Sequence, residues 1–477
     1  MYNMENRRLI IVSNRLPVVI KKNVENKCEL SRASGGLVTA ITPILKRDGG
    51  VWIGWAGNYL EENIKLDDYL KKEEENLNYK YRSVDISLSD YELYYKGFCN
   101  EILWPLFHNI SLYCIFEANY YEAFKKINKK FAQVVINELV ETDFIWVHDY
   151  HLINTGKELR EMGVKNDIAF FLHIPFPPFE TFNRIPWRLE IIDAMLSYDL
   201  VGFQTQIDKK NFLEAVDSLT SSVPSEQKEK GITKIVVQNK EHKVGVFPIS
   251  IDYDEFHDQL NNKEDSIMVQ TIRENYPNQK IILGVDRLDY SKGIPQKLRA
   301  YKRLLEKNKY LQKKVKLIQI VVPSREDIAK YIKLKSEIEQ LVGEINGKFS
   351  QPGWIPIQYC YHALNRKELI SYYRVSDIAL VTPLKDGMNL VAKEYCAANI
   401  NKDGVLILSE FAGTSQQFKD NALLINVFDK DSIVNAIKEA IYMKKKDKKR
   451  RMENMQNNVQ KFDIYWWVDT FIKAVKT

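Results

Sequence analysis

The stretch LKDGMNLVAKEY, residues 384–395, decides the predicted fold. It follows a strand-like run at 377–382, DIALVT, and it begins what we predict to be a helix. Pro383 and Gly387 are turn residues, and Asn389 is a suitable N-cap for that helix. A buried strand, a tight turn and a helix N-terminus together are typical of an anion site in an α/β sheet, because unpaired N–H groups and the helix dipole converge there.

Two carboxylates in this stretch, Asp386 and Glu394, are eight residues apart. One lies at the turn and the other lies just over one helical turn beyond the N-cap. They could therefore hold two parts of one ligand, and a polyhydroxylated sugar needs such acceptors when it is buried. The alternative is an ordinary helix start with surface charge, and this stretch alone does not decide between them.

Strand-like runs alternate with helical segments along the whole chain, which predicts an α/β protein with parallel sheets. The runs lie at 9–13, 143–147, 168–172, 199–203, 243–247, 280–285, 315–322, 377–381 and 405–408. The strand–helix alternation continues through about residue 250 and then restarts. We therefore predict two doubly wound domains, at 1–250 and 251–455, whose strand ends face each other across a cleft. An aromatic helix within 456–477 is expected to pack back on the first domain.

Candidate ligand-binding residues follow several of these strands. His173 comes after the run IAFFL, on the edge where open α/β sheets bind ligands. Arg287 and Lys292 flank a loop after KIILGV, and two fixed cations suit a diphosphate. A salt-bridge network between Asp and Arg side chains is the alternative there. The Ser-Gly-Gly turn at 34–36 opens a helix and resembles a phosphate loop, although two glycines alone are a weak signal.

Composition and cysteine usage exclude several classes of protein. The 477 residues are 45% hydrophobic and 28% charged, and no apolar run reaches the ~18 residues of a membrane span. Five widely spaced cysteines form no CxxC pair, which favours a reducing cytoplasm. His148 and His151 are three apart, yet no third ligand follows, so we expect no metal. The basic run at 444–451 is interpreted as a solvated helix end rather than a nucleic-acid site.

The ordered motifs of the chain resemble the trehalose-6-phosphate synthases, which are retaining glycosyltransferases of the GT-B fold. The matching motifs cover nearly the whole sequence and are VSNRLP, SGGL, WIGWAG, ILWPLFH, WVHDYHL, FFLHIPFP, DLVGFQT, RLDYSKG, INGKF, LVTPLKDGMNLVAKEY and SEFAG. The resemblance implies transfer of glucose from UDP-glucose to glucose-6-phosphate, giving α,α-trehalose-6-phosphate and UDP without a cofactor or a metal.

For the acceptor, the resemblance implies that Arg15 and Arg325 meet the phosphate of glucose-6-phosphate. Tyr95 and Trp104 would line the acceptor pocket, and Trp55 is a further candidate. These assignments are carried over from the family's motifs to the matching positions of this sequence.

For the donor, the resemblance implies that Gly35 and Gly36 lie under the diphosphate beside Arg287 and Lys292. The nucleotide end would be held by Leu364 and by the helix start, residues Leu390, Val391, Ala392, Lys393 and Glu394.

At the reacting centre, the resemblance places Asp149 between donor and acceptor, and His173 and Asp386 on the transferred glucose. The family's same-face mechanism needs no carboxylate nucleophile, so none is assigned, although the sequence alone leaves one open.

A related glucosyltransferase that acts on glycerol-3-phosphate and a non-catalytic regulatory relative are the alternatives to the synthase. The chain reaches Thr477 without the Asp-x-Asp-x-Thr loop of a fused phosphatase. We therefore expect the product to stay phosphorylated unless a separate trehalose-phosphate phosphatase acts on it. A cytoplasmic homo-oligomer, either a dimer or a tetramer, with no membrane or nucleic-acid partner is expected.

Overall fold

The computed structural model describes residues 7–22, 28–32, 36–57, 70–72, 74–75, 77–110, 114–220, 222–229, 231–258 and 263–476. The chain forms two compact units, Met1–Ile249 with Tyr465–Thr477 and Ser250–Ile464. Residues 456–464, which we had assigned to the returning segment, belong to the second unit. The cause is helix α18 (Lys445–Lys461), which packs Met452, Met455 and Val459 into the core of that unit. The basic run lies at the start of this helix.

The first unit is built on a nine-stranded sheet in the order β5-β4-β1-β6-β7-β8-β11-β10-β9. Its strands are β1 (Leu9–Arg15), β4 (Gly50–Trp55), β5 (Tyr79–Ser83), β6 (Phe144–His148), β7 (Ile168–Phe171), β8 (Leu200–Phe203), β9 (Ser222–Glu229), β10 (Ile232–Val237) and β11 (Lys240–Val246). Pairing is parallel from β5 to β11 and antiparallel for β10 and β9. The direction of winding reverses between the neighbours β1 and β6, so ligand-binding loops are expected at their carboxyl ends.

The predicted strand–helix alternation was wrong between residues 222 and 246. There the chain forms an antiparallel meander, because Gln238 and Asn239 both adopt positive φ angles, 50° and 64°. Two such residues between strands make the two-residue hairpin turn. A second hairpin, outside the main sheet, pairs β2 (Val18–Lys22) with β3 (Cys28–Arg32).

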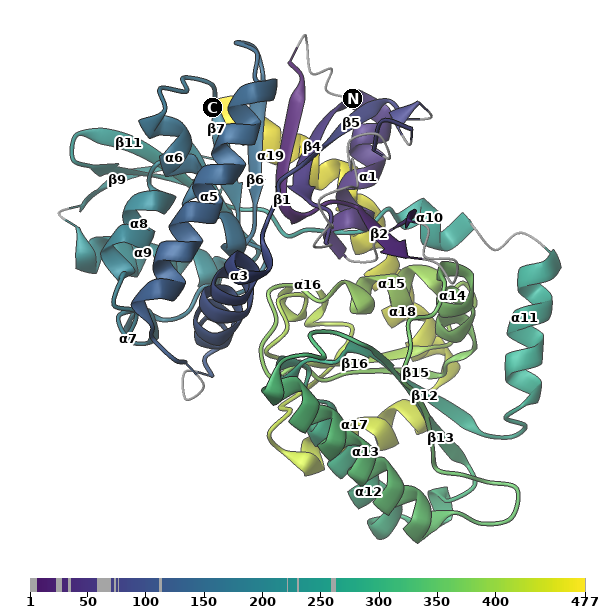
Figure 1. Cartoon of the computed structure of the whole chain (residues 1–477). Helices are drawn as coiled ribbons and strands as arrows, with labels where there is room; N and C mark the ends of the chain where they lie inside the picture. Colours follow the sequence, from purple (N-terminus) through teal and green to yellow (C-terminus); the bar gives the residue numbers. More distant parts are fainter. Residues whose placement is uncertain are drawn as a thin grey trace. The chain divides into compact units, whose positions relative to one another are not determined.

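Helices surround the first sheet (Figure 1). They are α1 (Gly36–Asp48), α3 (Leu88–Tyr91), the π-helix η1 (Glu92–Leu103), α4 (Trp104–Phe107), α5 (Ala118–Glu138), η3 (Tyr150–Leu152), α6 (Thr155–Glu161), α7 (Phe179–Phe182), α8 (Arg188–Met195), α9 (Gln206–Leu219) and α19 (Ile464–Lys476). The predicted C-terminal aromatic helix is α19, which lies against the sheet. Its Phe471 ring stacks on Trp146 at 4.4 Å between centroids, and its Trp467 Nε1 donates to the Phe247 carbonyl at 2.9 Å.

The second unit is a six-stranded parallel sheet in the order β14-β13-β12-β15-β16-β17. The strands are β12 (Lys280–Arg287), β13 (Val315–Val322), β14 (Ile357–Cys360), β15 (Ile378–Val381), β16 (Val405–Ser409) and β17 (Leu423–Ile425). Numbered within the unit, this order is 3-2-1-4-5-6, which is the Rossmann order. The reversal lies between β12 and β15, whose carboxyl ends precede the RLDYSKG and PLKDG segments.

Helices lie on both faces of the second sheet. They are α10 (Tyr253–Asp258), α11 (Lys263–Glu274), η4 (Tyr290–Lys292), α12 (Ile294–Lys307), η5 (Lys309–Leu311), α13 (Ala329–Phe349), α14 (Arg366–Val375), α15 (Leu390–Ala398), α16 (Ser415–Phe418), α17 (Lys430–Tyr442) and α18. In the described ranges, no helix combines the length and the apolar composition that a membrane crossing needs.

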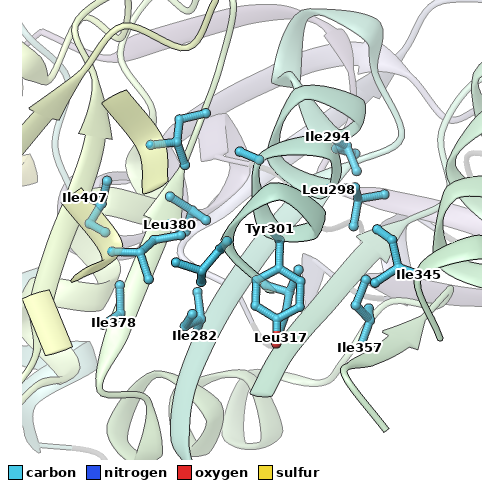
Figure 2. Close-up of a cluster of buried hydrophobic side chains, with 14 of the residues drawn as sticks. Ile282, Ile294, Leu298, Tyr301, Leu317, Ile345, Ile357, Ile378, Leu380 and Ile407 are labelled. Atoms are coloured by element: carbon cyan, nitrogen blue, oxygen red, sulfur yellow. The ribbon is translucent and has the colours of Figure 1, made fainter. Parts of the chain in front are cut away.

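Alternation along each strand divides the core of this unit into two layers. Ile282 packs with the α12, α13 and α17 side, whereas its neighbours Ile281 and Leu283 pack with the α14, α15 and α18 side. Figure 2 shows the first layer, in which Tyr301 of α12 lies over Leu317. Burial on both faces explains why these strands are mostly apolar.

Candidate active site

The carboxyl end of β1 places Arg15 against aromatic rings. Its Cζ lies 4.6 Å from the ring centroid of Trp55, at the end of β4, and 5.8 Å from that of Tyr95. A guanidinium over aromatic faces keeps its hydrogen-bond donors available at its edge. The structure therefore brings together three of the residues that the sequence predicted for the acceptor.

Two aromatic residues beside Tyr95 were missed in the sequence. The Tyr95 ring stacks on Tyr91 at 4.9 Å and on His151 at 5.7 Å. Tyr95 lies on the π-helix η1, and π-helical turns are frequently found at functional sites. We had considered His151 only as a metal ligand, and no sequence signal showed this stacking because the two residues belong to different segments.

Trp104, another predicted acceptor residue, is 4% exposed and packs in the interior. Its ring lies 4.2 Å from that of His108 and 5.7 Å from that of Tyr150, whose ring in turn lies 3.8 Å from that of His151. Trp104 therefore packs on Tyr150, which in turn supports His151. The predicted contact of Trp104 with an acceptor stays a prediction.

Asp149 follows β6 with a strained backbone. Its φ of 75° and ψ of 165° lie in a region that residues with a side chain rarely adopt. The backbone is held there because its N–H donates to the Phe171 carbonyl at 2.8 Å, and its Oδ1 accepts from the His173 N–H at 3.2 Å. Its Oδ2 lies 3.9 Å from His151 Nδ1. In this strained conformation, the Asp149 side chain lies where the parallel strands of the sheet end, beside β1.

His173 and His148 contact each other at the same edge. Nε2 of His173 lies 3.1 Å from Nδ1 of His148. Burial lowers the pKa of His173 to about 3, and burial also lowers the pKa of His148 well below its usual value. Both rings are therefore neutral at physiological pH. In the described part of the chain, no group of three or more His, Cys, Asp or Glu side chains is placed to hold a metal ion.

Of the two glycines predicted for the diphosphate, Gly36 is the first residue of α1 and is exposed. Gly35 lies outside the described residues. The roles of both stay predictions.

In the second unit, the carboxyl end of β12 carries the two predicted cations. Arg287 is the last residue of the strand and is exposed, while Lys292 lies in η4 with its Nζ 2.6 Å from Oδ2 of Asp386. Gly293, with φ of 65°, follows; a Cβ there would lie 2.1 Å from the Thr382 carbonyl oxygen. Close backbone approach at Gly293 therefore joins the two loops at this reversal point.

The turn after β15 is held by backbone contacts. The Asp386 N–H donates to the Phe411 carbonyl at 3.2 Å, and the Gly413 N–H donates to the Asp386 carbonyl at 3.1 Å. A Cβ on Gly413 would lie 1.8 Å from the Gly387 carbonyl oxygen, so the SEFAG segment needs glycine here. As predicted, Asn389 caps α15: its Oδ1 accepts from the Ala392 N–H at 3.2 Å. Its Nδ2 also donates to Asp386 Oδ2 at 3.1 Å.

The first turn of α15 combines exposed and buried residues. Leu390 and Val391 are partly exposed, whereas Ala392, Lys393 and Glu394 are buried. Burial lowers the pKa of Lys393 to about 7 and raises the pKa of Glu394. The N-terminus of this helix lies beside the Asp386 turn, because its cap Asn389 also bonds Asp386, and an anion is favoured at such a helix end.

The carboxylate of Glu394 has partners that the sequence did not indicate. Its Oε2 accepts from the Tyr373 hydroxyl at 2.8 Å, and its Oε1 lies 4.0 Å from Arg366 Nη1. Leu364, which was predicted to hold the nucleotide end, lies just before Asn365, the N-cap of α14, and packs against the core.

Arg325, predicted to meet the acceptor phosphate, also has positive φ, 52°. Its side chain is 7% exposed, its Nη1 lies 3.3 Å from Asp289 Oδ2, and it contacts the Tyr331 hydroxyl. The structure thus shows an Asp–Arg ion pair of the kind that we had considered as the alternative for the loop after β12, and it joins Asp289 of that loop to Arg325. The acceptor role of Arg325 stays a prediction.

Two Rossmann-like sheets, each with charged residues at the point where its winding reverses, define a GT-B glycosyltransferase. The chain belongs to glycosyltransferase family 20, whose model matches residues 7–477. The resemblance seen in the sequence is therefore confirmed.

Known relatives cover almost the whole chain. The α,α-trehalose-phosphate synthase (UDP-forming) of Candida albicans is 38% identical over 98% of this chain and 97% of its own length. A trehalose-6-phosphate synthase of Mycobacterium marinum is 36% identical over 98% and 93%. Among solved structures, an α,α-trehalose-phosphate synthase (UDP-forming) from Burkholderia xenovorans in complex with glucose-6-phosphate gives a TM-score of 0.90 at 35% identity, over 98% of this chain and 100% of that one. An Escherichia coli protein bound with UDP-2-fluoro glucose gives 0.87 at 35% identity, over 98% and 99%.

Proposed function

We propose that this protein is a UDP-forming α,α-trehalose-phosphate synthase, which transfers glucose from UDP-glucose to glucose-6-phosphate with retention. The observation that carries the proposal is the near-complete match to relatives of that name, at 36–38% identity over 98% of the chain. Residues of suitable chemistry lie at both reversal points, as the reaction requires.

The donor diphosphate is assigned to the reversal point between β12 and β15. There Lys292 and Arg287 supply positive charge, and the N-terminus of α15 supplies N–H groups. Negative charge develops on the leaving diphosphate as the glycosidic bond breaks, and preorganised positive charge is usually the largest electrostatic contribution to such a step. Glu394 is assigned to the ribose and Asp386 to the glucose.

The acceptor is assigned mainly to the reversal point between β1 and β6. Aromatic faces at Trp55 and Tyr95 suit the apolar face of a hexose, and the Arg15 guanidinium suits its phosphate. Asp149, fixed by its strained backbone, accepts hydrogen bonds from sugar hydroxyls. In the same-face mechanism, the leaving phosphate oxygen takes the proton of the attacking hydroxyl, so we assign no nucleophile to Asp149 or Asp386.

A UDP-release assay tests this function directly. The protein is incubated with UDP-glucose and with glucose-6-phosphate, glycerol-3-phosphate or no acceptor, and the products are analysed by mass spectrometry. We expect UDP release with glucose-6-phosphate and a non-reducing disaccharide phosphate. UDP release with glycerol-3-phosphate alone would refute the assignment of glucose-6-phosphate as the acceptor. No UDP release with any acceptor would refute the proposed glucosyltransferase activity.

The setting of the reaction is part of the proposal. We expect the protein in the cytoplasm as a homo-oligomer, with a separate phosphatase that removes the phosphate from the product. Sedimentation of the purified protein tests the oligomer, because a single 55.8 kDa species would contradict it.

A further inference from the structure

The contact between His148 and His173 restricts where their ring hydrogens can lie. His148 Nδ1 and His173 Nε2 are 3.1 Å apart, which is hydrogen-bond distance. A neutral imidazole has one N–H and one lone pair, so one ring must donate and the other must accept. The location of a single hydrogen therefore decides the tautomer of both rings.

The far side of His148 indicates which ring donates. Among the described residues, none is placed to bond His148 Nε2, which is buried, and the same holds for Trp146 Nε1, in the neighbouring ring at 4.7 Å between centroids. The indole N–H can only donate. An N–H on His148 Nε2 would add a second unsatisfied donor beside it, whereas a lone pair there has the polarity that an indole N–H favours. The hydrogen of His148 therefore belongs on Nδ1, facing His173.

We propose that His148 is a positioning residue that fixes His173 as the tautomer with its hydrogen on Nδ1. His148 Nδ1–H donates to His173 Nε2, which leaves Nδ1–H as the polar group that His173 can offer to a ligand. The His173 backbone is held at the same time, because its N–H donates to Asp149 Oδ1 at 3.2 Å. Trp467 of α19 covers the pair, 6.4 Å from His148 and 6.3 Å from His173 between ring centroids.

The consequence for catalysis rests on the proposed function, in which His173 meets the transferred glucose. A fixed Nδ1–H is a hydrogen-bond donor, so it binds a sugar hydroxyl through its oxygen. The opposite tautomer would offer a lone pair at the same atom and would need that hydroxyl to rotate. His148 thus selects one orientation of the donor sugar without touching it.

The tautomer can be measured without turnover. The chain has seven histidines, so selective 15N labelling of histidine gives few ring signals, and His173→Gln identifies those of His173. We expect two-bond 1H–15N correlations at pH 7.5 to show a protonated Nδ1 and a bare Nε2 on His173. A protonated Nε2, or an equal mixture, would overturn the proposal. This result is independent of whether the protein makes trehalose-6-phosphate.

Two substitutions then separate positioning from packing. His148→Asn keeps an amide donor near the Nδ1 position, whereas His148→Asp offers an acceptor that draws the His173 hydrogen to Nε2. We expect His148→Asn to keep the tautomer and most of the activity. His148→Asp should reverse the tautomer and lower kcat/KM for UDP-glucose by ~10²-fold, with KM for glucose-6-phosphate nearly unchanged.

Comparison of His148→Asn with His148→Asp can also refute the proposal. Equal losses in both variants, with the His173 tautomer unchanged, would show that His148 only fills space and would refute the proposal. If His148→Asp does not fold, the tautomer in the unmodified protein and in His148→Asn still decides the question.

Discussion

The two reversal points of strand order have the same topology, yet they hold their charged residues by different means. Between β1 and β6, Arg15 lies on aromatic rings and Asp149 on a strained backbone. Between β12 and β15, Lys292 is ion-paired with Asp386, and backbone hydrogen bonds hold the turn.

This difference agrees with the proposed assignment of one ligand to each reversal point. Aromatic rings beside Arg15 offer flat apolar faces next to a guanidinium, and this combination suits a sugar phosphate. Backbone-held turns with cations and helix N–H groups suit a diphosphate, whose charge is the same whatever sugar follows it. Each prediction below perturbs one of the two reversal points.

The largest effect is expected from Lys292→Ala. This substitution removes the ammonium group that lies 2.6 Å from Asp386 Oδ2, so the Asp386 carboxylate loses a positively charged partner. Because the same cation is proposed to stabilise the leaving diphosphate, turnover should fall by ~10²-fold or more. Steady-state UDP release measures this. Lys333→Ala, an exposed position on α13, is the control and should be neutral. Normal turnover in Lys292→Ala would contradict the proposal that Lys292 stabilises the leaving diphosphate.

Gly413→Ala tests the backbone contact behind the same reversal point. The added Cβ would lie 1.8 Å from the Gly387 carbonyl oxygen, so the Asp386 turn must move, at a cost of ~1–3 kcal/mol in stability. We expect a lower denaturation midpoint and weaker UDP binding.

Gly343→Ala is the matched control, because nothing lies within 4 Å of a Cβ there and the residue is in helix α13. It should stabilise the protein by up to ~1 kcal/mol. A Gly413→Ala variant as stable and active as Gly343→Ala would contradict the close approach.

Acid should lower the stability of the first unit, because His148 and His173 are buried there as neutral rings. Burial lowers the pKa of His173 to about 3, and burial lowers that of His148, so both rings gain protons mainly in the unfolded chain. Below pH 6.5 the unfolded state binds more protons, so the free energy of unfolding should fall from pH 7 to pH 5, by about 2 kcal/mol from His173 alone and by more with His148. Urea denaturation at both values measures it. His148→Phe should show a smaller fall, and an equal fall in both proteins would contradict the neutral pair.

The smallest effect is expected at the aromatic wall. Tyr95→Leu removes a ring that stacks on Tyr91 and His151, and one aromatic contact contributes ~1 kcal/mol, so KM for glucose-6-phosphate should rise about fivefold. Tyr95→Phe keeps the stack and should change KM less. KM for UDP-glucose should be unaffected in both, and a selective rise in it would place Tyr95 with the donor instead.

Local pattern was sufficient for much of the fold. Apolar runs predicted the parallel strands, and Asn389 was predicted as a cap because its oxygen suits the first turn of α15. The family and the GT-B class are confirmed by the comparisons. The meander at 222–246 was missed because Gln238 and Asn239 are not the usual residues of a two-residue hairpin turn.

Contacts between distant segments could not be predicted. Nothing near His151 indicates that its ring stacks on Tyr95, and nothing near Glu394 indicates Tyr373. The strain at Asp149 also depends on a neighbouring strand, through the Phe171 carbonyl and the His173 N–H. Such features follow from the tertiary arrangement of the sheet, whereas caps and turns follow from residues close in sequence.

The most direct test of the two-site account is calorimetric titration of UDP into Lys292→Met, Arg15→Met and the unmodified protein. Lys292→Met removes a charge from the proposed donor site and should weaken UDP binding by ~10-fold or more. Arg15→Met removes a charge of the same sign from the proposed acceptor site and should leave the Kd for UDP unchanged. Equal weakening in both variants, or weakening in Arg15→Met alone, would contradict the division of donor and acceptor between the two reversal points.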